Sequence, residues 1–168
     1  EIKLTFRRLL NIVPSRGMAY INGDEQNCLD VADKAPCPVT TVGFGENCAL
    51  RIENVKYEPD RSSFTLGGVP YSTRMTGEFN VRNAAMAVAT ATFAGLTPDE
   101  IRDGLETFEG VARRQELRGE VNGIKVIDDF AHHPTAIRLA VQSMRQRHPD
   151  SRLWVLFEPR SNTTRRAV

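Results

Sequence analysis

The sequence predicts an α/β protein in two parts, and three observations support this fold class. Apolar residues at helical spacing alternate along the chain with short apolar runs bounded by Gly, Pro and Asn, which are typical of strands. Towards the C-terminus the order is strand, helix, strand and a new helix start, which favours a parallel sheet. Between the parts, residues 110–115 are the candidate boundary between a domain of residues 1–112 and one of residues 113–168.

Helices and strands alternate at the start of the chain. Residues 2–13 place apolar side chains mostly on one helical face, and a Pro-Ser-Arg-Gly run ends this helix. Residues 18–22 have the composition of a strand. Residues 25–35 fit a short helix that stops before two prolines, and residues 39–44 fit a buried strand.

A strand-rich segment and two helices follow. Residues 49–71 alternate polar and apolar side chains around Gly67 and Gly68, which predicts β-hairpins. Residues 80–93 are rich in Ala, Val and Met, so we expect a helix. Residues 97–108 begin with a threonine cap, a proline and two acidic residues, which is the signature of a helix start.

The last part of the chain predicts a hairpin, a helix and a strand. An Asn-Gly pair between two strand-like runs in residues 116–129 is a strong hairpin signal. Residues 134–147 fit a helix that begins with a proline, and residues 153–157 fit a buried strand. We expect a further helix from residue 161.

Composition and charge exclude several classes of protein. The 168 residues include 40% hydrophobic and 26% charged side chains, which are ordinary globular values. The 22 basic residues nearly balance the 21 acidic ones, so a nucleic-acid-binding or polybasic membrane-binding protein is not expected. No apolar run approaches the ~18 residues of a membrane-spanning helix. Three cysteines without a CxxC pair favour a reduced, cytoplasmic protein.

Two asparagines open the helix expected at residues 80–93. Asn80 and Asn83 lie three residues apart and therefore share one face of its first turn. A carboxamide can donate and accept side by side, which suits the N6/N7 edge of adenine. The alternative interpretation is that Asn80 is the N-cap and Asn83 an ordinary polar residue of the first turn.

An apolar strand end at residues 126–127 leads into two carboxylates and two imidazoles. These four residues are Asp128, Asp129, His132 and His133. Ligands of open α/β sheets bind at such strand ends, where an aspartate can accept hydrogen bonds from ribose hydroxyls. Adjacent histidines lack the i, i+4 spacing of a metal-binding pair, so a metal site is less favoured. The alternative is a capping aspartate with surface histidines.

Polar and basic side chains also follow the last expected strand. Arg160, Ser161 and Asn162 stand at a helix start, whose backbone N–H groups suit an anionic ligand. Arg113 and Arg114 at the candidate boundary could clamp a phosphate or a ribose. The alternatives are an ordinary capped helix and a solvated surface. No GxxxxGK(S/T) phosphate loop occurs in the sequence.

Together these segments resemble the Mur ligase family, ATP-dependent enzymes of bacterial cell-wall peptide synthesis. GEFNVRNAAMAVA is similar to the adenine-contacting helix, GVARRQE to the hinge, and IDDFAHHPTAI to the opening of the third domain. The resemblance implies the C-terminal part of a central ATPase domain, followed by the start of a Rossmann-like C-terminal domain. The implied ATP-binding residues are Asn80, Asn83, Arg114 and Asp129, with Mg²⁺ at the phosphates. His132 and His133 are the implied catalytic residues, and Arg160, Ser161 and Asn162 the implied substrate-binding residues.

Within the family, DDFAHHPTAI and FEPRSNT are most similar to members that recycle murein by joining UDP-N-acetylmuramate to the tripeptide L-alanyl-γ-D-glutamyl-meso-diaminopimelate. The implied reaction forms an acyl phosphate from the muramyl carboxylate and ATP, and the tripeptide amine then displaces phosphate. Since the phosphate loop is missing and both ends of the sequence fall at expected helices, we expect a piece of a larger protein that is inactive alone. The alternatives are a UDP-N-acetylmuramate–L-alanine ligase and a non-catalytic adenine-nucleotide-binding module.

Overall fold

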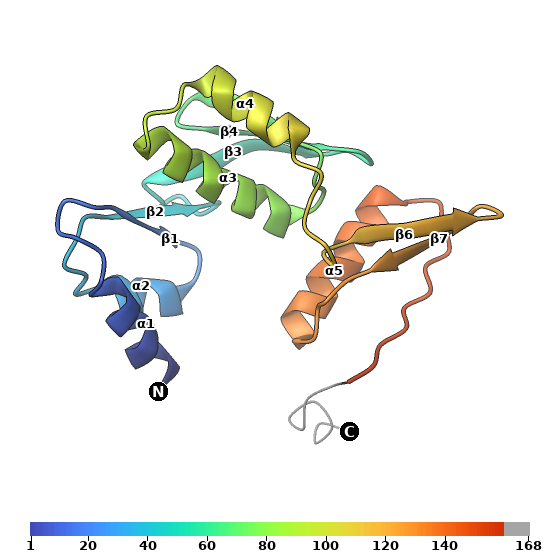
Figure 1. The fold of residues 1–168 in the computed structure, drawn as a ribbon, viewed down its shortest axis with the longest axis horizontal. Coiled ribbons are helices and arrows are strands. Elements are labelled where there is room, and N and C mark those ends of the chain that lie inside the picture. The colour runs from blue at the N-terminus through green and yellow to red at the C-terminus, as the bar shows by residue number, and fades with distance from the viewer. Residues whose placement is uncertain (160–168) are drawn as a thin grey trace.

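A computed structural model describes residues 1–159 of the chain (Figure 1). Up to residue 147 the helices and strands occur in the predicted order. The helices are α1 (Ile2–Leu10), α2 (Gln26–Ala32), α3 (Glu78–Phe93), α4 (Pro98–Thr107) and α5 (Pro134–Arg147). The strands are β1 (Ala19–Asn22), β2 (Val39–Gly43), β3 (Leu50–Tyr57), β4 (Ser62–Leu66), β5 (Val69–Thr73), β6 (Glu116–Val121) and β7 (Ile124–Asp128). The helix predicted from residue 161 lies outside the described residues.

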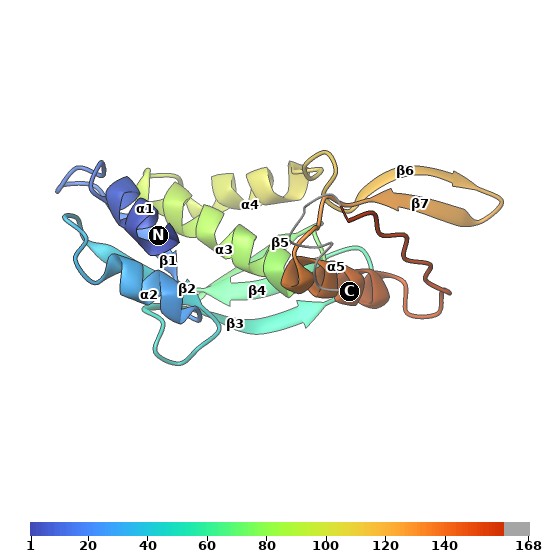
Figure 2. The same cartoon turned by 90° about the horizontal axis from the view of Figure 1, so that it is seen from below.

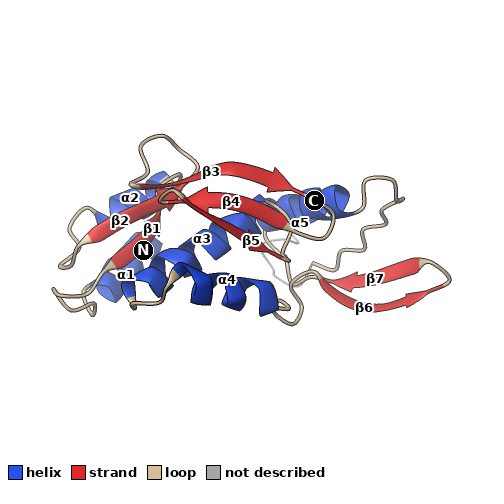
Figure 3. Cartoon of the chain, turned by 90° about the horizontal axis from the view of Figure 1, so that it is seen from above, coloured by secondary structure: helices blue, strands red, loops and turns tan. Residues whose placement is uncertain are grey.

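Strands β1 to β5 form one mixed sheet in chain order. The first three strands are parallel, whereas β3, β4 and β5 form the antiparallel hairpins that the sequence predicted. Helix α2 makes the connection that parallel pairing of β1 with β2 requires. Helices α3 and α4 lie along one face of the sheet (Figure 2 and Figure 3).

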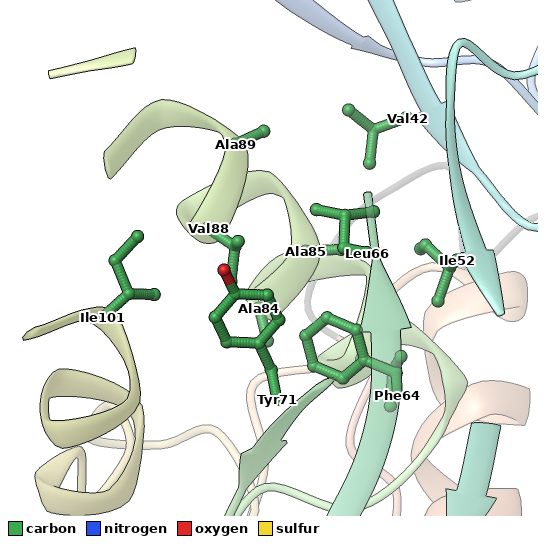
Figure 4. Close-up of a cluster of buried hydrophobic side chains, with 11 residues drawn as sticks. Val42, Ile52, Phe64, Leu66, Tyr71, Ala84, Ala85, Val88, Ala89 and Ile101 are labelled. Carbon is green, nitrogen blue, oxygen red and sulfur yellow. The ribbon is translucent and has the colours of Figure 1, made fainter. Parts of the chain in front are cut away.

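The core lies between this sheet and α3 (Figure 4). Strand β4 alternates buried and half-buried side chains, as a strand with one face on the core must. Small side chains on α3 let the helix backbone approach the sheet closely. The buried cluster consists of Val42, Ile52, Phe64, Leu66, Tyr71, Val81, Ala84, Ala85, Val88, Ala89 and Ile101.

The start of α3 differs from the prediction by two residues. Gly77 is the N-cap, and its φ of 95° is a conformation that favours glycine. Asn80 therefore lies inside the first turn, and the alternative interpretation of Asn80 as the N-cap is wrong. Helix α4 begins as predicted, because Thr97 and Glu100 form a reciprocal capping box.

The C-terminal part contains the predicted hairpin and helix. Strands β6 and β7 pair antiparallel, and Asn122 and Gly123 in their turn have φ values of 51° and 78°. Two positive φ angles are what a tight two-residue hairpin turn of this kind requires, which explains the Asn-Gly pair. Helix α5 begins at Pro134, directly after this hairpin and a short loop.

The buried strand predicted at residues 153–157 is wrong. This segment is irregular, and Trp154 and Leu156 are 75% and 94% exposed. A strand needs a neighbour for its backbone N–H and C=O groups, and no strand among residues 1–159 pairs with this segment. For the same reason the parallel sheet predicted for this end of the chain does not form within the described residues, where the β6–β7 pair stands alone.

Candidate functional site

A cavity of about 700 Å³ lies between α3, α4 and the hinge segment, which we define as residues 108–115. Apolar side chains make up most of its wall, and a few polar ones interrupt them. The apolar part includes Phe79, Ala84, Val88, Leu105, Phe108 and Val111, and the polar part includes Asn80, Asn83, Glu100, Arg114 and Gln115. A concave, mainly apolar site with a small number of placed polar groups is the usual form of a small-molecule pocket.

The two predicted asparagines line this cavity from the first turns of α3. The side-chain Nδ2 of Asn80 donates to the backbone oxygen of Thr76 over 2.8 Å, which fixes the direction of its carboxamide. One N–H and the Oδ1 of Asn80 are left for a ligand. Asn83 is exposed and its side chain makes no hydrogen bond to any of residues 1–159, so its whole carboxamide can serve a ligand.

Arg114 joins the asparagines at the cavity, whereas Arg113 turns to the end of β7. The Nε of Arg113 lies 3.4 Å from the Asp128 carboxylate. The guanidinium carbons of Arg113 and Arg114 lie 5.1 and 5.8 Å from the ring centroid of Phe130, within the range of a cation–π contact. The ring of Phe130 therefore holds the paired arginines beside the loop that follows β7.

Asp129 is committed to backbone contacts that join this loop to the hinge segment. Its Oδ2 accepts the N–H of Gln115 over 3.1 Å, and its Oδ1 accepts the N–H of Ala131 over 2.7 Å. The second contact spans two residues, as in an Asx turn. A carboxylate has further lone pairs, so Asp129 keeps some capacity to accept a hydroxyl.

The two histidines have local partners and do not line the cavity. The Nδ1 of His132 lies 3.0 Å from the backbone oxygen of Phe130, and its ring packs edge-on against the Phe130 ring. His133 is the N-cap of α5, and its Nδ1 accepts the N–H of Thr135 over 3.4 Å. Both histidines are exposed. A capping role accounts for the position of His133.

Three of the predicted site residues thus meet at one cavity, namely Asn80, Asn83 and Arg114. Asp129 is linked to it through the backbone of Gln115, and His132 and His133 lie in the adjoining loop. Arg160, Ser161 and Asn162 lie outside the described residues.

Sequence reasoning missed Gln115 and the apolar wall. Gln115 is 92% buried, since only 8% of its surface is exposed, and it lines the cavity. A glutamine beside two arginines reads as a surface residue, and its burial depends on α5, which follows much later in the chain. The apolar wall had a signal, because Phe108 and Val111 are large apolar residues within a predicted boundary segment.

A carboxylate holds the hinge segment from the start of β6. Glu116 accepts the N–H of Arg113 over 2.8 Å and lies 2.7 Å from the guanidinium of Arg118. The Arg113 N–H, helped by Arg118, holds the pKa of the Glu116 carboxyl below its usual range. At neutral pH Glu116 therefore remains ionised and keeps this contact.

Other candidate sites are weaker. A cavity of about 360 Å³ between α1 and α2 is lined by charged groups that already pair with each other, such as Lys3 and Asp30 at 2.6 Å. Within residues 1–159, no group of three or more His, Cys, Asp or Glu side chains could hold a metal ion. In the same residues, no helix has the length and apolarity needed to cross a membrane.

Comparisons with known proteins agree with the resemblance found in the sequence. Residues 1–91 match the Mur ligase middle domain, and residues 113–168 match the domain described as Mur ligase, glutamate ligase domain. The UDP-N-acetylmuramate–L-alanine ligase of Salinibacter ruber is 37% identical over 94% of this chain and 34% of its own length. That of Clostridium novyi is 30% identical over 95% of this chain and 35% of its own length.

A solved structure is similar over nearly the whole chain. The murein peptide ligase of Psychrobacter arcticus is 30% identical, with a TM-score of 0.66 over 96% of this chain and 35% of that one. The chain therefore spans about a third of the length of the relatives it matches. Because the middle-domain match alone covers more than half of the chain, this protein belongs to the Mur ligase family.

Proposed function

We propose that this chain is the nucleotide-binding part of an ATP-dependent ligase of peptidoglycan recycling. The ligase joins UDP-N-acetylmuramate to the tripeptide L-alanyl-γ-D-glutamyl-meso-diaminopimelate. The observation that carries the proposal is the cavity that Asn80, Asn83 and Arg114 share in a Mur ligase chain. The composition of that cavity supports a nucleotide as its ligand.

Adenine suits the cavity in shape and in hydrogen bonding. A planar base can lie against the apolar wall, while the carboxamides of Asn80 and Asn83 donate to and accept from its polar edge. Arg114 supplies a fixed positive charge for the ribose and phosphate side. Asp129, already bonded to two backbone N–H groups, can accept a ribose hydroxyl with its remaining lone pairs.

Apart from Arg114, we assign no group within residues 1–159 to the phosphate end of ATP. The sequence lacks a phosphate loop, and the described residues lack a cluster of metal ligands for Mg²⁺. We therefore assign these residues mainly to the base and ribose, and we assign no residue here to Mg²⁺. In the proposed reaction, the muramyl carboxylate takes the γ-phosphate of ATP, and the acceptor amine then displaces phosphate from the acyl phosphate.

Two acceptors for the muramyl group are considered, the tripeptide and L-alanine. Similarity to the murein peptide ligase of Psychrobacter arcticus supports the tripeptide. The names of the relatives from Salinibacter ruber and Clostridium novyi support L-alanine, so a UDP-N-acetylmuramate–L-alanine ligase is the second candidate. The free thiols of the three cysteines fit the reduced cytoplasm, where we expect the protein to act.

Product analysis with the full-length gene product tests the proposal. The protein is supplied with ATP, Mg²⁺ and UDP-N-acetylmuramate, and L-alanine and the tripeptide are offered separately while phosphate release and product mass are followed. Ligation of the tripeptide supports the recycling function, and ligation of L-alanine alone supports the second candidate. ATP binding without ligation of either acceptor would favour a non-catalytic nucleotide-binding module.

A further inference from the structure

A cluster of buried polar side chains lies next to the candidate site. Of the five buried polar residues within residues 1–159, three belong to this cluster: Thr76, Gln115 and Ser143, which are 1%, 8% and 1% exposed. They come from the turn before α3, from the hinge segment and from α5. Because buried polar groups are costly unless they are hydrogen-bonded, such a cluster needs an explanation beyond packing.

The hydroxyl of Ser143 is the centre of the cluster. Its Oγ lies 2.8 Å from the backbone oxygen of Thr76 and 3.2 Å from Oε1 of Gln115. A hydroxyl carries one proton, so Ser143 donates to only one of these two acceptors at a time. The Nε2 of Gln115 is buried and has no partner. The cluster therefore has alternative arrangements, and the one in the structure leaves a donor unpaired.

Ser143 also packs very closely against the start of α3. A Cβ atom at Gly77 would lie 2.6 Å from the Ser143 Oγ and 2.8 Å from its Cβ. Together with its φ of 95°, this contact makes glycine necessary at position 77. Helix α5 therefore packs directly against the start of α3, the helix that carries Asn80 and Asn83.

The cluster shares atoms with the residues of the candidate site. The backbone oxygen of Thr76 accepts from Asn80 Nδ2 and from Ser143 Oγ, each over 2.8 Å. The backbone N–H of Gln115, the residue after Arg114, donates to Asp129 over 3.1 Å. A movement of α5 that breaks the Ser143 contact therefore changes the acceptor that orients Asn80.

We propose that Thr76, Gln115 and Ser143 form a polar latch that couples the docking of α5 to the nucleotide site. Ser143 and Gln115 act as positioning residues. Ser143 steadies the Thr76 carbonyl that orients Asn80, and the bond between Ser143 and Gln115 holds the hinge segment, with Arg114 in it, against α5. The ligand side of this inference rests on the proposed function. The docking of α5 does not, because it follows from contacts within the chain.

Hydrogen exchange without nucleotide tests the docking. In the full-length gene product, Ser143→Ala removes the central hydroxyl, and we expect amides of residues 113–116 and 129–131 to exchange about fivefold faster, as for the loss of one hydrogen bond. The matched control is Ser62→Ala, which removes a hydroxyl that is equally buried but has no partner. Gln115→Met, nearly isosteric, serves as the second variant if Ser143→Ala does not fold. Exchange at wild-type rates in these segments would overturn the latch.

ATP affinity tests the coupling. We expect Ser143→Ala to weaken ATP binding about fivefold, and Ser143→Ala with Gln115→Met to weaken it less than the product of the two single effects, because both act through one latch. Asn83→Ala, outside the latch, should combine with Ser143→Ala multiplicatively. Unchanged ATP affinity alongside faster exchange would overturn the coupling. If the wild-type protein binds no ATP, the proposed function fails, and the exchange experiment alone decides whether α5 is latched.

Discussion

The two asparagines at the cavity differ in how they are held. Asn80 is oriented by the backbone oxygen of Thr76, whereas the Asn83 side chain is exposed and lacks a hydrogen bond to the described part of the chain. We predict that Asn83→Ala weakens ATP binding by about tenfold, the loss of one or two hydrogen bonds, and leaves the free energy of unfolding within about 0.5 kcal/mol. Titration calorimetry and chemical denaturation of the full-length gene product measure the two effects. Thr90→Ala, an exposed change further along α3, is the control; an equal loss of affinity there would argue against a specific role for Asn83.

The contact between Glu116 and the hinge segment depends on pH. The pKa of Glu116 is lowered chiefly by the N–H of Arg113. This contact therefore stabilises the folded state at neutral pH, above the unfolded pKa of ~4.3. The stabilisation is lost as the pH falls through the pKa of the folded state. We predict an NMR titration midpoint for the Glu116 carboxyl below the ordinary pKa of a glutamate. Arg118→Ala should raise this midpoint only slightly, because the larger cause is a backbone group that the substitution leaves in place. A midpoint at or above the ordinary value would contradict the contact.

A site residue could be predicted when residues close to it in the sequence determine its position. Asn80 and Asn83 were found because a spacing of three residues places them on one helical face, whatever the rest of the chain does. Gln115 was missed because its burial depends on Ser143, which lies 28 residues further along the chain. The position of Asp129 at a strand end was predicted, but its two backbone partners depend on how the hinge segment folds back, which no spacing reveals.

At the scale of elements, the core between the mixed sheet and α3 should dominate stability. Phe64 on β4 is 2% exposed and packs beside Tyr71, with ring centroids 5.9 Å apart. We predict that Phe64→Ala lowers the free energy of unfolding by about 3–5 kcal/mol, since it removes apolar contacts and leaves a cavity. Thr65→Ala, on the other face of the same strand, should change it far less. Equal effects of the two substitutions in chemical denaturation would mean that this face of the sheet is not the core.

Predictions of helices, turns and strands succeeded where neighbouring residues determine the structure, and failed where a distant pairing partner determines it. The Asn122-Gly123 turn and the Thr97 cap of α4 each form from residues within a few positions, and both occur as predicted. The segment at residues 153–157 has the apolar composition of a strand, but a strand exists only as part of a sheet. Without a neighbour among residues 1–159, the same composition gives an exposed irregular segment.

At the scale of the whole molecule, the described chain exposes large apolar side chains on several surfaces, two of which are α1 and the segment beyond α5. On α1 these are Ile2, Leu4, Phe6 and Leu9, which are 52–74% exposed, and beyond α5 they are Trp154, Val155, Leu156 and Phe157. Contiguous apolar surface of this kind promotes association. We predict that the 168-residue chain, produced alone, self-associates at micromolar concentration in size-exclusion chromatography, and that its elution volume shifts towards that of a monomer on dilution. Elution as a monomer at every concentration would mean that these surfaces repack in solution.

The same chain should bind adenine nucleotide without turning it over. Under the proposed function its cavity binds the base and the ribose, while the sequence contains no phosphate loop and the described residues contain no metal-ligand cluster to act on the γ-phosphate. We predict no measurable ligation or phosphate release by the 168-residue chain with ATP, Mg²⁺, UDP-N-acetylmuramate and either acceptor. The full-length gene product, assayed beside it, is the positive control. If the isolated chain does ligate, and Asn83→Ala abolishes that ligation, then phosphate activation needs neither a phosphate loop nor a metal-ligand cluster. Such a result would move the reacting end of ATP to the loop after β7, where His132 and His133 are exposed and where the Phe130 ring contacts both His132 and Arg113.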